Sequence, residues 1–380
     1  MAETRTQQRR NHICCVRLSV LKNMTENHQR RNFIRRSVAA AISFCAGCAH
    51  KKDGSLLSIK DADSIRTLAE QSPQSGGIEV IKLETGREFR FKGLAIDLKT
   101  EKAYLGSWDK KEIVVVSLKE KTHSTIKTGY SGKLNGMGTY LKRDKLYAVM
   151  NEVNDSPNAR PVSVLLVIAL TNHHILRSYE AVGVNGRHHF NHVVVDDNGI
   201  AYVSDTLKSA IYTVNTNNPA DNLKQLVERK DLSRVHGIDL SADGSRLFST
   251  SYDGGIRFFD LKTKGFSPFK DLATADNDGL KYYEGCLYGV GNNALRKYTL
   301  NKAEDGIIRT EVLLSDHEFF NDPRCLHIEA GYLYCLANIE FEPVEFRRSG
   351  KTTRKTPLSD SYLIKLKLDE NVRRKIERNA

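Results

Sequence analysis

Six polar or charged side chains stand at matching places in the sequence, each at the start of a repeated phrase of two apolar runs. They are Lys92, Asn135, Asn191, His236, Asp278 and Arg324. Amide and carboxylate oxygens together with an imidazole are suitable ligands for a divalent cation, and a histidine beside an aspartate also suits proton transfer. Lysine and arginine would instead attract an anion. If the fold gathers all six, the chemistry is metal binding, acid–base catalysis or anion binding.

The phrases that follow these residues reveal the elements that must position them. Each phrase has a short turn, an apolar strand, a second turn and a second strand, as in NHVVVDDNGIAYVSD from Asn191 and DGLKYYEGCLYGVGN from Asp278. The intervals between successive opening residues are 43, 56, 45, 42 and 46 residues. A period near 45 residues built from strands is typical of β-propeller blades.

The sequence therefore predicts an all-β fold, a six-bladed β-propeller made of four-stranded antiparallel blades. Third and fourth strands follow the repeated phrase, for example at Ala210–Asn215 and Ile256–Leu261. Ile78–Glu84 and Tyr362–Leu368 also read as strands, so pairing of the N-terminal and C-terminal strands would close the ring and leave no free sheet edge. We expect a leader at 1–47, a polar linker at 48–77, the propeller at 78–368 and a charged tail at 369–380.

In such a fold the six opening residues would surround the mouth of the central channel. The ends of the second strands would add Glu152 and Asp205 nearby, and Arg187 would add positive charge. Two insertions, Asn154–Ser163 and Glu340–Ser361, separate second and third strands and should overhang the same face. The alternative is a water-filled channel whose polar rim has no function.

At this point the pattern resembles a known superfamily, that of gluconolactonase, senescence marker protein and luciferin-regenerating enzyme. The resemblance rests on Asn191 in FNHVVVDDNG, on His236-Gly237, and on Asp278-Gly279-Leu280 followed by Tyr288, and it covers roughly Phe89 to Leu368. It implies a divalent cation at the channel mouth, Ca²⁺ by family pattern, that polarises a lactone carbonyl. By match, Asn191 and Asp278 would be metal ligands, and His236 would complete the candidate set of metal ligands.

Two residues depart from the family pattern. His236 stands where the family usually has asparagine, and Lys92 stands where it usually has a glutamate ligand. Ca²⁺ needs negatively charged oxygen ligands, so this ring would hold it weakly unless Glu152 or Asp205 turns inward. A histidine-containing set would instead favour Zn²⁺ or Mn²⁺. Without any metal the same ring is a cationic pocket.

These residues support two main functions. As a metal-assisted hydrolase of a sugar lactone or similar ester, the protein would use His236 or Asp278 to move the proton and Arg324 to stabilise the oxyanion. As a non-catalytic envelope propeller, it would bind an anionic small molecule at its basic mouth or scaffold a protein complex. The candidate ligand-binding residues are Lys92, Asn135, Glu152, Arg187 and Asp205. Whether the protein is an enzyme at all stays open at this stage.

Much of the positive charge lies in the leader. The formal net charge is +12, and residues 1–47 contribute nine basic and two acidic residues, leaving +5 for the remainder. Nucleic acid is therefore not an expected partner. The segment RRNFIRR followed by SVAAAISFCAG resembles a twin-arginine export signal, and it is too short to span a membrane. Ala46-Gly47-Cys48 resembles a lipobox.

These signals predict an exported monomer in a bacterial periplasm, with Cys48 lipidated and the protein anchored to the outer membrane. The alternative is a plain cleaved signal with an incidental cysteine. Beyond the leader, Cys325 and Cys335 lie on consecutive strands, where either a cross-strand contact or two half-buried thiols is expected.

Overall fold

The computed structural model describes residues 77–131, 133–152, 162–181, 187–228, 232, 234–251, 255–268, 277–337 and 359–368. The leader, Cys48, almost all of the linker, the tail and nearly all of both insertions lie outside these ranges, so the expectations about them stay predictions. Within the described ranges, no helix is long and apolar enough to cross a membrane.

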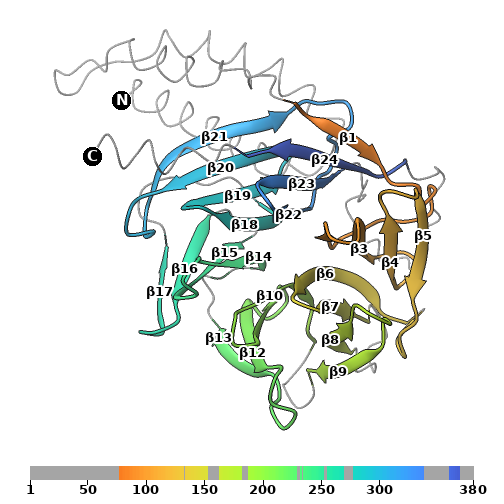
Figure 1. Cartoon of the computed structure of the whole chain (residues 1–380). Coiled ribbons are helices and arrows are strands. Elements are labelled where there is room, and N and C mark those ends of the chain that lie inside the picture. Colours follow the sequence, from red (N-terminus) through yellow and green to blue (C-terminus); the bar gives the residue numbers. More distant parts are fainter. Residues whose placement is uncertain are drawn as a thin grey trace, which may run out of the picture. The chain divides into compact units, whose positions relative to one another are not determined.

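The described chain forms six four-stranded antiparallel sheets arranged around a central axis (Figure 1). Blade 1 contains β2 (Ala95–Asp97), β3 (Lys102–Ser107), β4 (Glu112–Ser117) and β5 (Thr122–Ile126). Blade 2 contains β6 (Asn135–Lys142), β7 (Lys145–Asn151), β8 (Ser163–Ala169) and β9 (Ile175–Glu180). Blade 3 contains β10 (Phe190–Val195), β11 (Ile200–Asp205), β12 (Ala210–Asn215) and β13 (Lys224–Glu228).

The remaining blades follow the same order from the inner strand to the outer strand. Blade 4 contains β14 (Val235–Leu240), β15 (Arg246–Ser251), β16 (Ile256–Asp260) and β17 (Gly265–Pro268). Blade 5 contains β18 (Gly279–Tyr283), β19 (Cys286–Gly291), β20 (Ala294–Leu300) and β21 (Ile307–Ser315). Blade 6 contains β22 (Cys325–Glu329), β23 (Tyr332–Ala337), β24 (Tyr362–Lys367) and β1 (Glu79–Lys82). The predicted fold class is therefore confirmed.

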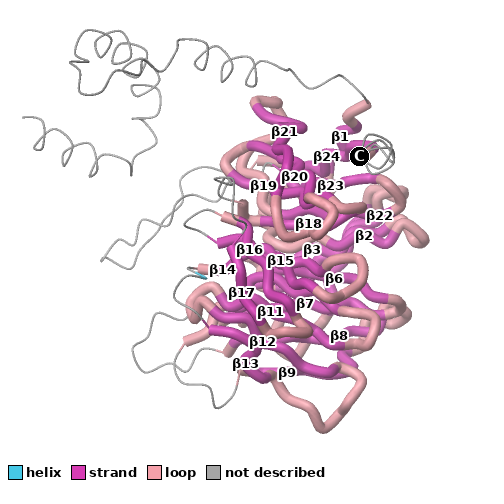
Figure 2. Tube along the Cα trace, turned by 90° about the vertical axis from the view of Figure 1, so that its left-hand side faces the viewer, coloured by secondary structure: helices cyan, strands magenta, loops and turns pink. Residues whose placement is uncertain are grey.

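Blade 6 closes the ring, because its outer strand comes from the beginning of the propeller. β1 pairs antiparallel with β24, with Glu79 opposite Lys365 and Lys82 opposite Tyr362. The Lys365 ammonium also donates to the Glu79 carboxylate at 2.8 Å. This closure is the one predicted from the two terminal strand patterns, and Figure 2 shows β1 beside β24 in the side view.

The core lies between the blades, which explains the apolar runs on the inner strands. Side chains alternate along β10, so Val193 and Val195 pack into one buried cluster with Val149 of blade 2. Val194 points to the opposite face and packs into another cluster with Ile238 of blade 4. Both faces of an inner strand are therefore buried, and a nearly continuous apolar sequence results.

In four of the six blades a glycine follows the opening residue and lets the inner strands approach one another near the axis. A Cβ added to Gly93 would lie 2.1 Å from the Met137 carbonyl oxygen of the next blade, and one at Gly237 would lie 2.7 Å from the Leu280 nitrogen. The repeated polar-glycine pair thus has a structural reason, since the glycine allows close packing and the polar residue faces the channel.

Hairpin turns fall where the sequence predicts them. Glu284 and Gly285 join the paired residues Tyr283 and Cys286, with φ of 46° and 72°. Positive φ at both turn residues is the conformation of the tight type I′ hairpin.

The two cysteines of blade 6 do not make the cross-strand contact that was one of the two expectations from the sequence. Cys325 pairs with Leu336 and Cys335 pairs with Leu326, so the two thiols point to opposite faces of the sheet. Both are buried and free.

Candidate functional site

The six opening residues lie at one end of the inner strands, which we call the channel mouth. Asn135, Asn191 and His236 belong to β6, β10 and β14, whereas the other three immediately precede or lie near the first strands of their blades. Backbone hydrogen bonds fix two of the latter, since the Lys92 nitrogen donates to Gly106 at 2.9 Å and the Asp278 nitrogen donates to Val290 at 2.7 Å. The blade framework therefore positions these polar groups.

Asp278 is the centre of the channel mouth. Its carboxylate accepts from the Lys92 ammonium at 2.7 and 2.9 Å, and from the Arg324 guanidinium at 2.7 Å. His236 Nδ1 lies 2.7 Å from the same carboxylate and donates to it. One aspartate of blade 5 thus joins side chains from blades 1, 4 and 6.

This cluster of Lys92, His236, Asp278 and Arg324, here called the mouth cluster, is largely buried and is joined by direct hydrogen bonds to Asp278. Burial alone would raise the pKa of Asp278, but the charges of Lys92 and Arg324 and the hydrogen bond from His236 outweigh burial and hold that pKa well below its usual range. Burial would lower the pKa of Arg324, yet Asp278 and Asp322 raise it. The carboxylate and the guanidinium are therefore charged at neutral pH.

Both asparagines at the mouth use their amide nitrogen in a hydrogen bond, whereas their amide oxygen accepts none from the part of the chain that the structure describes. The Asn191 amide nitrogen donates to the Thr206 hydroxyl at 3.0 Å and lies 3.4 Å from His236 Nδ1. The Asn135 amide nitrogen donates to the Trp108 carbonyl at 2.7 Å. The Oδ1 atoms of Asn135 and Asn191 are buried and have no hydrogen-bond partner among the described residues. Each can accept a hydrogen bond from a ligand.

Three other predicted residues take different positions. The Asp205 carboxylate is fully buried and holds His188 Nδ1 at 2.6 Å, together with the backbone nitrogens of Leu207 and Lys208. It therefore fixes the turn after β11 and does not point toward the mouth cluster. Glu152 accepts from the Val162 nitrogen at 3.3 Å, and Arg187 is exposed.

The donors at the mouth do not fit a divalent cation. The three predicted metal ligands, Asn191, His236 and Asp278, lie together, but the carboxylate is already bonded to an ammonium, a guanidinium and an imidazole N–H. Within the described ranges, no group of three or more His, Cys, Asp or Glu side chains is arranged to hold a metal ion. The Lys92 ammonium occupies the position beside Asp278 that a cation would need.

Two further histidines lie close to the mouth cluster and are uncharged at neutral pH. Burial, assisted by the charge of Lys92, lowers the pKa of His189 to about 4. Burial lowers the pKa of His192 to about 3. Both values lie below the ordinary histidine pKa of about 6.5, so folding is coupled to loss of protons at these rings.

Acidification is therefore expected to destabilise the protein well before its carboxylates titrate. Between pH 6.5 and about 4 the unfolded chain binds a proton at each of these histidines and the folded chain does not. Stability should fall by about 1.4 kcal/mol per pH unit for each histidine once the unfolded form is protonated. Urea unfolding at pH 7, 6 and 5 measures this loss.

The matched control is the double substitution of His189 and His192 by glutamine, which removes both titrating rings. It should flatten the dependence of unfolding free energy on pH between 7 and 5. An equal slope for the variant and the natural chain would contradict the assignment. Asp278 does not disturb this window, because its depressed pKa affects stability only below about pH 4.

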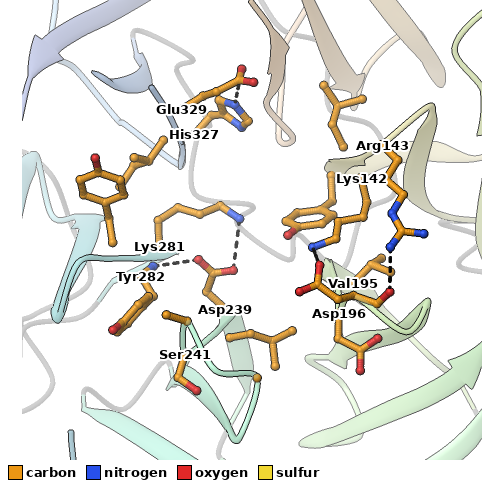
Figure 3. A pocket seen from close by; sticks show the side chains of 18 of the residues that line it. Lys142, Arg143, Val195, Asp196, Asp239, Ser241, Lys281, Tyr282, His327 and Glu329 are labelled. Atoms are coloured by element: carbon orange, nitrogen blue, oxygen red, sulfur yellow. Dashed lines mark hydrogen bonds and ion pairs between the residues drawn. The ribbon is translucent and has the colours of Figure 1, made fainter. Parts of the chain in front are cut away.

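At the opposite end of the inner strands lies a cavity of about 800 Å³ that the sequence analysis did not predict. Every blade contributes to it through the end of its inner strand or the hairpin that follows. Figure 3 shows Lys281 and Asp239 on one side, Lys142 and Arg143 on the other, and His327 near Glu329. We call it the hairpin-side cavity. The sequence held a signal for it, since Asp239, Lys281 and His327 each stand three residues after an opening residue.

Comparison with known proteins identifies the fold. No family model matches the sequence, and no curated protein matches it. Among solved structures, luciferin-regenerating enzyme is similar with a TM-score of 0.51 and 13% identity, covering 76% of this chain and 95% of that chain. Catalytically inactive virginiamycin B lyase from Staphylococcus aureus, with quinupristin, is similar with a TM-score of 0.50 and 11% identity, covering 77% and 99%.

A third solved structure extends the same similarity. A protein from Thermus thermophilus described as a putative oxidoreductase (glucose dehydrogenase) has a TM-score of 0.50 and 15% identity, covering 76% of this chain and 100% of that chain. Identities this low establish a shared fold, and proteins with a shared fold carry out different chemistry. The predicted resemblance to the gluconolactonase and luciferin-regenerating enzyme superfamily is therefore confirmed at the level of the six-bladed propeller fold.

Proposed function

We propose that the channel mouth hydrolyses a sugar lactone or a similar ester, with His236 as the general base. The observation that carries this proposal is the mouth cluster, in which Asp278 holds His236 Nδ1 at 2.7 Å while two cationic side chains contact the same carboxylate. A carboxylate that fixes one imidazole nitrogen orients the ring and stabilises its protonated form.

In this mechanism His236 Nε2 takes a proton from a water molecule as the water oxygen bonds to the substrate carbonyl carbon. The carbonyl electrons move to the oxygen, and the resulting oxyanion is stabilised by the positive field of Lys92 and Arg324. Collapse of the oxyanion breaks the ester C–O bond, and the proton passes from His236 to the departing alkoxide. A lactone gives a single hydroxy acid and an open-chain ester gives an alcohol and a carboxylic acid. The acid group ionises at neutral pH.

The unpartnered amide oxygens of Asn135 and Asn191 would accept hydrogen bonds from substrate hydroxyl groups. This arrangement favours an oxygen-rich substrate over an apolar ester, because an apolar group would leave both buried acceptors unsatisfied. In virginiamycin B lyase, a propeller of similar fold, a histidine-to-alanine variant is catalytically inactive. Chemistry that depends on a histidine is therefore compatible with this fold.

Hydrolysis of a panel of sugar lactones and simple esters by the purified full chain tests this function. We expect turnover that persists in a chelator, since the mouth cluster does not fit a divalent cation. His236→Gln should lower kcat by about a hundredfold or more, the usual contribution of a general base. His123→Gln is the matched control, because His123 is exposed on β5 of blade 1 and should leave turnover unchanged.

The second candidate function is binding of an anionic small molecule without chemistry, which the two cationic side chains of the mouth cluster favour. Thermal unfolding in the presence of aldonic and uronic acids separates the two functions. Stabilisation by an acidic sugar without turnover of any lactone would support binding alone. Turnover lost in His236→Gln and kept in His123→Gln would support hydrolysis.

A further inference from the structure

The hairpin-side cavity is separated from the channel mouth by the length of the inner strands. Lys281, which lines it, lies on β18 three residues beyond Asp278. Its volume of about 800 Å³ is within the range of small-molecule sites in proteins. Three tyrosine side chains, Tyr140, Tyr282 and Tyr283, contribute to its walls. The cavity is thus large enough for a ligand of its own.

The lining carries an excess of negative charge. Seven Asp and Glu side chains face three basic side chains, Lys142, Arg143 and Lys281, which gives a formal charge of −4. Burial lowers the pKa of His327, so this imidazole adds no positive charge at neutral pH. Hydrogen bonds from Ser241 and Ser245 lower the pKa of Asp243 to about 2, which keeps that carboxylate ionised.

The Lys281 ammonium shows how side chains of the cavity lining surround a positive charge. Lys281 Nζ lies 4.8 Å from the centroid of the Tyr140 ring and 3.6 Å from the Asp239 carboxylate. The Lys281 side chain is 15% exposed, so its ammonium is largely removed from water. An aromatic face together with a carboxylate is a favourable environment for an organic cation. The other carboxylates of the lining, such as Glu329 and Asp196, surround the same space.

We propose that the hairpin-side cavity binds a small organic polycation of the linear polyamine class. Its ammonium groups would lie against the carboxylates around the cavity, and its methylene segments would pack on the tyrosine faces. A neutral polyol would gain hydrogen bonds but would leave the negative field unbalanced. This site does not depend on the function proposed for the channel mouth, because the two share no ligand-binding residue.

Isothermal titration of the full chain with spermidine tests the proposal, with sorbitol as the neutral probe and Mg²⁺ as the inorganic cation. We expect saturable spermidine binding and no heat from sorbitol. The isosteric double variant Asp239→Asn/Glu329→Gln should weaken spermidine binding by about tenfold or more, since two carboxylates of the cavity are neutralised.

Asp239 also accepts from the Tyr282 backbone nitrogen at 2.8 Å, so a second variant guards against a folding defect. Asp197→Asn/Glu284→Gln neutralises two lining carboxylates at less structural cost, since the Asp197 side chain is 84% exposed, and should also weaken spermidine binding. Glu120→Gln, an exposed carboxylate outside the cavity, should leave affinity unchanged. The proposal is overturned by equal spermidine affinity in all variants, by sorbitol binding instead, or by Mg²⁺ competing at the same concentration.

Discussion

Replacing Asp278 with alanine is expected to lower the free energy of unfolding by about 3–5 kcal/mol, the usual cost of removing one partner from a buried ion pair. Asp278 is 7% exposed and Lys92 is 8% exposed, so the loss leaves the Lys92 ammonium buried without its carboxylate. Arg324 and His236 lose the same acceptor. Urea unfolding at pH 7 measures the effect, and it is one of the largest expected for a single substitution in this protein.

Asp322→Ala is the matched control. Asp322 also forms an ion pair with Arg324, at 2.6 Å, but its side chain is 26% exposed and water can replace it. A loss below about 1 kcal/mol is expected there. If Asp278→Ala costs no more than Asp322→Ala, the cations of the mouth cluster must reach solvent easily. The cross-channel connection of four blades through one carboxylate would then contribute little to stability.

The fold could be predicted from the sequence because its signals are local and repeated. Each inner strand must be apolar on both faces, as Val193 and Val194 show, and each hairpin needs residues that tolerate positive φ, as Gly285 shows. Gly93 and Gly237 are required by close approach between blades. Six copies of one pattern leave few alternative folds, and the terminal strands had to close the ring to avoid a free edge.

The contents of the two ends of the channel were harder to predict. The sequence aligns Lys92 with Asp278 but does not show whether the ammonium faces the carboxylate or a ligand, because they are 186 residues apart. Asp205 was expected at the mouth, but its carboxylate instead contacts His188 and accepts a hydrogen bond from the Leu207 backbone nitrogen in the turn after β11. Tyr140 of blade 2 stands five residues after Asn135, outside the three-residue spacing of Asp239, Lys281 and His327. The spacing therefore does not reveal that Tyr140 lines the hairpin-side cavity.

Lys92→Glu is expected to create the divalent cation site that the natural chain does not offer. The substitution replaces the ammonium beside Asp278 with a second carboxylate. Without metal the variant should be much less stable, because two buried carboxylates repel each other. Calcium should restore stability. If the site binds Ca²⁺ with a Kd near 10⁻⁴ M, the free energy of unfolding should rise by about 2.7 kcal/mol when the free Ca²⁺ concentration is a hundredfold above that Kd.

Thermal unfolding with 10 mM Ca²⁺ or with chelator measures this change in three proteins. Lys92→Glu should gain thermal stability with Ca²⁺, whereas the natural chain should not, since the Lys92 ammonium occupies the position of the cation. Lys92→Gln is the control that removes the ammonium without adding a carboxylate, and it should respond weakly if at all. A calcium response in the natural chain equal to that of Lys92→Glu would mean that the mouth cluster can exchange its ammonium for a metal ion, and hydrolysis would then have to be reconsidered as metal-assisted.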